Sequence, residues 1–221
     1  MTVLLILATF VLFLTIDYFY SKKRAAVPAV QMARSVAAVP VPDVVAGFRI
    51  RENFRYHLGH TWALAESPNL VRIGIDDFAA RLAGKVERIA LPQRGQWVRQ
   101  GQKIIALFRD GQKTEMVSPI EGMVTDVNPA IAQDANAARH DPYGEGWLLT
   151  VQSPDAKTNF RNLLGGAVAR KWLEEAAARL RLRMPTLAGA TLQDGGLAVE
   201  NLTEHLPDAG WSELTREFFL V

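Results

Sequence analysis

The sequence predicts a mainly β domain, a barrel-sandwich hybrid with short helices, preceded by one N-terminal transmembrane helix and followed by a C-terminal helical extension. Three observations lead to this prediction. Segments rich in β-forming residues alternate with turn residues over residues 103–127, an apolar run spans residues 3–20, and a helical pattern spans residues 160–183. With 221 residues, 49% of them hydrophobic, the chain can form one ordinary core with additions.

The central feature is a predicted β-hairpin. Residues 104–108 and 114–117 are apolar, β-rich runs, and Asp110-Gly111 lies between them. Asp-Gly favours a tight turn in which φ is positive, so this dipeptide is expected at the tip of the hairpin. A Ser-Pro turn follows, after which residues 123–127 resume an extended pattern.

Several further motifs accompany this hairpin in a characteristic order. They are His60-Thr61-Trp62, residues 71–75 with Asp77-Phe78-Ala79, residues 89–92 with Gly95 and Val98, residues 117–122, Val127-Asn128, and residues 141–148. With these motifs the chain, from about residue 60 to 153, resembles the H protein of the glycine cleavage system, a relative of lipoyl and biotinyl carrier domains. The resemblance covers a little under half of the chain and implies that residues 48–158 form an H-protein-like β domain.

The predicted hairpin tip departs from the family pattern. The resemblance implies a lipoyl-bearing lysine at the tip, seven residues before the serine of the Ser-Pro turn, and counting back from Ser118 gives Gly111. Glycine has no side chain to acylate, so the expected cofactor is none. Lys113 is the alternative attachment site. A two-residue shift of the hairpin would keep the strand faces but would move this lysine off the Asp-Gly tip, and a solvated strand residue is the simpler interpretation.

Residues 1–24 are predicted to form an uncleaved membrane anchor. The apolar run of residues 3–20 is long enough to cross a hydrocarbon core of about 30 Å, and its basic residues follow the run, whereas those of a signal peptide precede it. The predicted membrane-interface residues are Asp17, Tyr18, Tyr20, Lys22, Lys23 and Arg24. The basic flank predicts a single-pass protein of a bacterial-type inner (cytoplasmic) membrane, with its C-terminal domain in the cytoplasm.

A linker connects the anchor to the first predicted strand of the β domain. Prolines at 28, 40 and 42 oppose a continuous helix, so residues 25–47 are expected to form an extended linker. Residues 48–56 alternate apolar and polar side chains and predict one half-buried strand. Its outer face carries Arg49, Arg51 and Arg55, for which a solvated face is favoured over a phosphate or lipid contact because no glycine-rich phosphate loop accompanies them.

Two further segments are expected after the β domain. Residues 159–184 predict an amphipathic helix whose apolar stripe comprises Leu164, Val168, Trp172, Ala176 and Leu180. Residues 185–221 form an extension with a second hairpin signal at Asp194-Gly195-Gly196. The predicted partner-binding residues of its last segment are Trp211, Leu214, Phe218, Phe219 and Leu220. Such a run is unfavourable in water, so it either folds back on the domain or binds another protein, and we expect the second.

No constellation of catalytic or metal-binding residues emerges from the sequence. The chain has no cysteine, no phosphate-binding loop and no nucleophile with a base at a familiar spacing, so we expect no enzyme activity. His57 and His60 lie three residues apart, but a structural histidine is favoured over a metal pair because no third ligand accompanies them. Trp97 is expected in the core or at a sheet edge.

These features predict a non-catalytic, membrane-anchored accessory subunit that docks in a larger membrane protein complex, with respiratory or photosynthetic electron-transfer assemblies as natural hosts. Its expected partners are the other subunits and the bilayer, through residues 3–20, and no nucleic acid. The alternative is a carrier protein lipoylated on Lys113 that serves a membrane-associated oxidoreductase.

Overall fold

The computed structural model describes Thr15, residues 44–183, Ala198, Leu202 and residues 208–220. The chain divides into residues 1–41 and residues 42–221, and the fold below is that of the second unit. The predicted interface residues 17–24 and the hairpin signal at 194–196 lie outside the described residues. Within the part of the chain that is described, no helix combines the length and apolar character needed to cross a membrane.

Two antiparallel sheets and a short ribbon form the β domain. The six-stranded sheet has the order β3 (Arg55–Tyr56), β4 (Thr61–Ser67), β5 (Leu70–Ile75), β11 (Leu149–Gln152), β10 (Gly122–Val127) and β7 (Trp97–Val98). The three-stranded sheet has the order β6 (Arg88–Ala90), β8 (Lys103–Arg109) and β9 (Gln112–Val117), and β1 (Val44–Val45) pairs with β2 (Phe48–Arg49). The prediction of a mainly β fold with short helices is confirmed.

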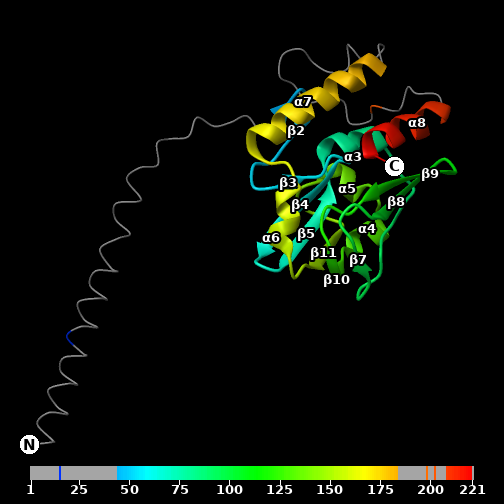
Figure 1. Ribbon diagram of the computed structural model, residues 1–221. Helices are drawn as coiled ribbons and strands as arrows, with labels where there is room; N and C mark the ends of the chain where they lie inside the picture. Colours follow the sequence, from blue (N-terminus) through cyan, green and yellow to red (C-terminus); the bar gives the residue numbers. More distant parts are fainter. Residues whose placement is uncertain (1–14, 16–43, 184–197, 199–201, 203–207, 221) are drawn as a thin grey trace, which may run out of the picture. The chain divides into compact units, whose positions relative to one another are not determined.

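Six helices complete the described structure (Figure 1). They are α3 (Asp77–Ala83), α4 (Pro129–Gln133), α5 (Ala137–His140), α6 (Ala156–Arg161), α7 (Gly166–Arg183) and α8 (Asp208–Phe219). Helices α3, α7 and α8 lie together at one side of the sheets, and α8 contacts both α3 and β9. Side chains from both sheets and from these three helices share the larger hydrophobic core, which includes Trp62, Phe78, Leu107, Leu173 and Phe218.

The hairpin forms where the sequence predicts it. Strands β8 and β9 pair with Arg109 opposite Gln112, which leaves Asp110 and Gly111 as a two-residue turn. Both residues have positive φ, 48° and 73° respectively, as a type I′ turn requires. The two-residue shift considered for Lys113 is therefore not the pairing that the chain adopts.

Residues 48–56 do not form the single strand that their alternation predicts. Strands β2 and β3 are separated by a turn, closed by the Phe54 N–H that donates to the Arg51 carbonyl at 3.3 Å. The inward side chains are nevertheless those expected, since Phe48, Ile50, Phe54 and Tyr56 are all buried. A two-residue turn keeps the period of two, so the pattern alone does not reveal the break.

The predicted helix over residues 159–184 is two helices, α6 and α7, separated by a segment in which Leu164 bridges to Tyr56. The buried face of α7 consists of Ala169, Leu173, Ala176, Ala177 and Leu180. The predicted stripe is thus partly wrong, because Val168 is 62% exposed. A spacing of four residues drifts by about 40° per step around a helix with 3.6 residues per turn, so a long stripe of this kind leaves the buried face.

Candidate functional site

The hairpin tip carries no amine. Gly111 is exposed, and a Cβ atom added to it would meet nothing within 4 Å. Beside it, the Asp110 carboxylate accepts a hydrogen bond from Arg109 Nε at 3.1 Å, and the Asp110 N–H donates to Glu87 Oε1 at 3.3 Å. The tip is open to solvent and offers a carboxylate and a guanidinium, but no nucleophile for acylation.

Lys113 lies on strand β9, opposite Phe108, two residues beyond Gly111. Its Nζ atom donates to Glu115 Oε1 at 2.8 Å, and its side chain is 51% exposed. This hydrogen bond is the main reason that the pKa of Glu115 lies below its usual value; burial opposes it, and the charges of Lys113 and Lys103 contribute less. Lys113 is an ion-paired surface residue of a regular strand.

Helix α8 lies over β9 and α3, and it places the predicted partner-binding residues inside the domain. Trp211, Leu214, Phe218 and Phe219 are buried, whereas Leu220 is 52% exposed. The expectation that these residues contact a partner is therefore corrected for the first four, which belong to the core of this chain. The physical reason is that the chain supplies its own apolar surface for α8, a possibility that the pattern left open.

Specific contacts fix α8 in this position. The Trp211 indole N–H donates to the Ala83 carbonyl at 3.0 Å, and the Arg109 guanidinium lies over the Trp211 ring at 6.0 Å. The ring of Phe218 lies 5.2 Å from that of Phe78. Arg109 directly precedes the hairpin tip, so this contact links α8 to the hairpin.

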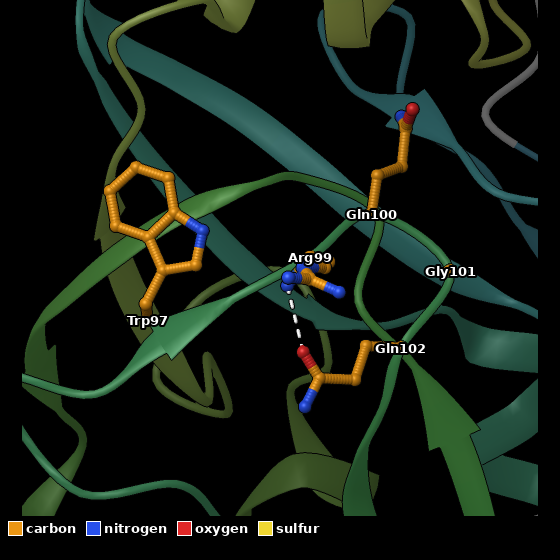
Figure 2. Close-up of a pocket in the computed structure, with 5 residues that line it drawn as sticks. All are labelled: Trp97, Arg99, Gln100, Gly101 and Gln102. Carbon is orange, nitrogen blue, oxygen red and sulfur yellow. Dashed lines mark hydrogen bonds between the residues drawn. The ribbon is translucent and has the colours of Figure 1, made fainter.

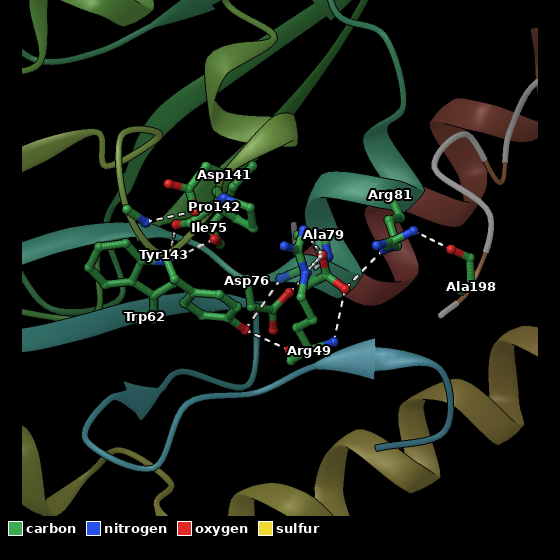
Figure 3. A network of polar contacts seen from close by, with 12 residues as sticks. Arg49, Trp62, Ile75, Asp76, Ala79, Arg81, Asp141, Pro142, Tyr143 and Ala198 are labelled. Atoms are coloured by element: carbon green, nitrogen blue, oxygen red, sulfur yellow. Dashed lines mark hydrogen bonds and ion pairs between the residues drawn. The ribbon is translucent and has the colours of Figure 1, made fainter. Parts of the chain in front are cut away.

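A buried network of charges joins β2, α3 and the C-terminal segment (Figure 3). The Asp77 carboxylate is 1% exposed and pairs with Arg49 Nη2 at 3.0 Å and with Arg81 Nε at 2.9 Å. Arg81 also donates to the Ala198 carbonyl. The expectation that Arg49 belongs to a solvated strand face is therefore corrected, because a buried carboxylate requires charged and hydrogen-bonding partners and Arg49 is one of those that Asp77 has.

His60 has a structural role in the same region. Its Nδ1 lies 2.8 Å from Asp76 Oδ2, and its ring lies between those of Phe78 and Trp172, at centroid distances of 4.2 and 4.5 Å. The other carboxylate oxygen of Asp76 accepts from Ala79 N–H at 2.8 Å and caps α3. Among the described residues, no three His, Cys, Asp or Glu side chains are arranged to hold a metal ion.

Tyr143 and His57 border this network. The Tyr143 hydroxyl donates to the Arg49 carbonyl at 2.9 Å, and burial raises the pKa of that hydroxyl well above its usual value. The His57 Nδ1 atom accepts from the Gly59 N–H at 3.0 Å. Burial, and to a smaller extent the neighbouring His60, lower the pKa of His57. Within the described residues these contacts are structural, and no reacting centre converges on Tyr143 or His57.

The structure also has an open hollow that the sequence did not indicate (Figure 2). It measures about 620 Å³ and is lined by Trp97, Arg99, Gln100, Gly101 and Gln102. Trp97 lies on the edge strand β7 and is 49% exposed, so it is at the sheet edge and not in the core. The sequence around Trp97 is compatible with burial, since the neighbouring Val98 is also apolar. It contains no local pattern that would predict the hollow.

Comparisons with known proteins agree with this architecture. Residues 54–176 match the family model for the glycine cleavage H-protein. The glycine cleavage system H protein of Anaeromyxobacter sp. (strain K) is 32% identical over 126 residues, which are 57% of this chain and 97% of the relative. The probable glycine cleavage system H protein 2 of Sulfurisphaera tokodaii is 30% identical over 136 residues, which are 59% of this chain and 90% of the relative.

Among solved structures, a glycine cleavage system H protein from Mycobacterium marinum is 24% identical, with a TM-score of 0.47, over 57% of this chain and 98% of that chain. Helix α8 lies beyond the residues that match the family model, whereas the hairpin lies within them.

Proposed function

Because this chain belongs to the glycine cleavage H-protein family, we propose that it is a non-catalytic, membrane-anchored accessory subunit, whose β domain serves for docking in a larger membrane protein complex. The observation that carries this proposal is the hairpin tip, where Asp110-Gly111 forms the turn. A domain that keeps its fold but lacks an amine at the carrier position retains a rigid surface for binding.

The residues at the tip do not fit a lipoyl group. An amide link to a lipoyl arm requires a lysine amine, and Gly111 has no side chain although the space around it is open. A lipoyl arm is therefore excluded from residue 111 by the missing amine and not by steric crowding. We assign no chemical step to a lipoyl group in this protein.

The N-terminal sequence supports membrane attachment. Residues 3–20 are apolar over a length that suits a bilayer, and Lys22, Lys23 and Arg24 follow them. We propose a single span in a bacterial-type inner membrane, with the β domain in the cytoplasm. Respiratory and photosynthetic electron-transfer complexes are the hosts we consider first, because small single-span subunits are common there.

The structure excludes the apolar face of α8 as the docking surface. Since Trp211, Leu214, Phe218 and Phe219 are buried within the domain, α8 does not supply the apolar contact. The binding surface of the β domain is therefore sought among side chains that the fold leaves exposed.

A second function, a lipoylated carrier that serves a membrane-associated oxidoreductase, has one observation in its favour. The Lys113 amine is half-exposed on the strand that leaves the tip, so an enzyme could reach it. Against it, Lys113 is paired with Glu115 and lies within the regular ladder of the hairpin.

Purification of the full chain from native membranes in a mild detergent, followed by intact-mass measurement, tests both functions. The accessory subunit is expected to have the mass of the unmodified chain and to co-purify with other subunits in a fixed ratio. Lys113→Arg should change neither result. A mass increase equal to one lipoyl group that disappears in Lys113→Arg, but persists in the control Lys103→Arg on the facing strand, would establish the carrier. Purification without any companion subunit would refute docking.

A further inference from the structure

The hollow beside Trp97 is a preformed surface. Trp97 is 49% exposed, and its direct cross-strand neighbour Met123 is 40% exposed, so two large apolar side chains adjoin in solvent. The loop from Arg99 to Gln102 forms the opposite wall (Figure 2). The family match does not assign a role to this surface.

Hydrogen bonds hold the loop in place. The Gln100 side chain donates to the carbonyls of Pro119 and Asn159, at 2.8 and 3.0 Å, and accepts from Asn162 at 2.7 Å. The Gly101 N–H donates to the Ser118 carbonyl at 2.8 Å. The loop is thus tied to the Ser-Pro turn and to the end of α6. A surface that is ordered before binding loses little entropy when a partner arrives, which favours affinity.

The charge of the hollow selects its occupant. Arg99 is the single charged residue among the five that line it. Its backbone N–H donates to Gln102 Oε1 at 2.9 Å, whereas its guanidinium has no partner within the described part of the chain. A guanidinium that is free to form two parallel hydrogen bonds is well suited to a carboxylate. Tryptophan, methionine and arginine are also the residue types that are enriched where proteins bind one another.

We propose that the hollow is a docking site for an acidic segment of a partner protein. An aspartate or glutamate of this segment pairs with the Arg99 guanidinium, and an apolar side chain next to it packs on Trp97 and Met123. The concave shape favours a protruding peptide segment over a flat bilayer surface. This inference rests on the proposed docking function and specifies the surface that performs it.

Site-specific photo-crosslinking in native membranes tests the proposal on the full chain. A photoreactive phenylalanine derivative replaces Met123, which leaves Trp97 and Arg99 intact, and the same derivative at Leu182, 81% exposed on α7, is the control position. The expected result is one crosslinked polypeptide, with the crosslink mapped to a segment that contains aspartate or glutamate. The control position should not crosslink to that segment.

Charge reversal supplies the specific readout. Arg99→Glu is expected to lower the crosslinked fraction by about tenfold, because a like charge then faces the carboxylate. Lys171→Glu, which changes the net charge equally on α7, should leave the fraction unchanged. Exchange of the crosslinked carboxylate residue for lysine should restore the yield in Arg99→Glu.

Three outcomes would overturn the proposal: crosslinks to lipid alone or to nothing, crosslinks to a segment without carboxylates, or an equal yield in Arg99→Glu. If the Met123 position fails in these ways while companion subunits still co-purify, the hollow is the wrong surface and the docking function stands. The absence of companion subunits would instead refute the docking function itself.

Discussion

Replacing Phe218 by alanine tests whether α8 belongs to the core of the domain. Phe218 is 1% exposed, its ring lies 5.2 Å from that of Phe78, and the Arg179 guanidinium lies over it at 5.4 Å. Truncation of a buried phenylalanine removes its transfer free energy and leaves a cavity, at a cost of about 3 to 5 kcal/mol. Since the free energy of unfolding of a domain is typically about 5 to 15 kcal/mol, this cost is a large part of the total stability.

The assay is urea unfolding of the full chain in a mild detergent, with tryptophan fluorescence as the signal that reports unfolding. Leu220→Ala is the matched control, because this residue ends the same segment but is 52% exposed. We expect it to change the free energy of unfolding by less than about 0.5 kcal/mol. If Phe218→Ala costs no more than this control, α8 is not packed as described, and its apolar face is again available to a partner.

Two further predictions concern titration. Lys113→Gln should raise the pKa of the Glu115 carboxyl toward its usual value, since the Lys113 hydrogen bond is what chiefly lowers it, and an NMR titration that shows the same pKa in both proteins would contradict the pairing. The His57 pKa is lowered in the folded chain, first by burial, so below pH about 6.5 the unfolded chain binds more protons and this contribution to stability falls as pH decreases. His57→Gln should weaken the loss of stability between pH 7 and 5, and an unchanged pH profile would show that the imidazole is solvated.

Local rules account for the parts of the fold that sequence reasoning predicted correctly. The Asp110-Gly111 turn needs positive φ at two adjacent residues, and few residue pairs allow it, so both the tip and the register of β8 and β9 follow from the sequence. Helix α3 is bounded in the same way, by the Asp76 cap and by Gly84, which has a φ of 68°. Such signals depend only on neighbours in the chain.

The errors arise where distant residues decide. The amphipathic pattern of residues 211–220 requires an apolar surface but does not say which molecule provides it. Here that surface comes from α3 and β9, with which α8 is in contact. Trp97, for which the sequence left a core position and a sheet edge open, lies at the edge because of how β7 pairs with β10. The ion pair of Arg49 with Asp77 joins β2 to a helix that begins 28 residues after Arg49.

The position of α8 also has a consequence for the order in which the protein matures. Its residues are synthesised after Phe78 and His60, yet its Phe218 ring lies against the rings of both. Contacts between such distant parts of a chain form late, because a long loop must close first. A nascent chain that has not yet reached residue 208 would present this uncovered apolar face to chaperones and proteases.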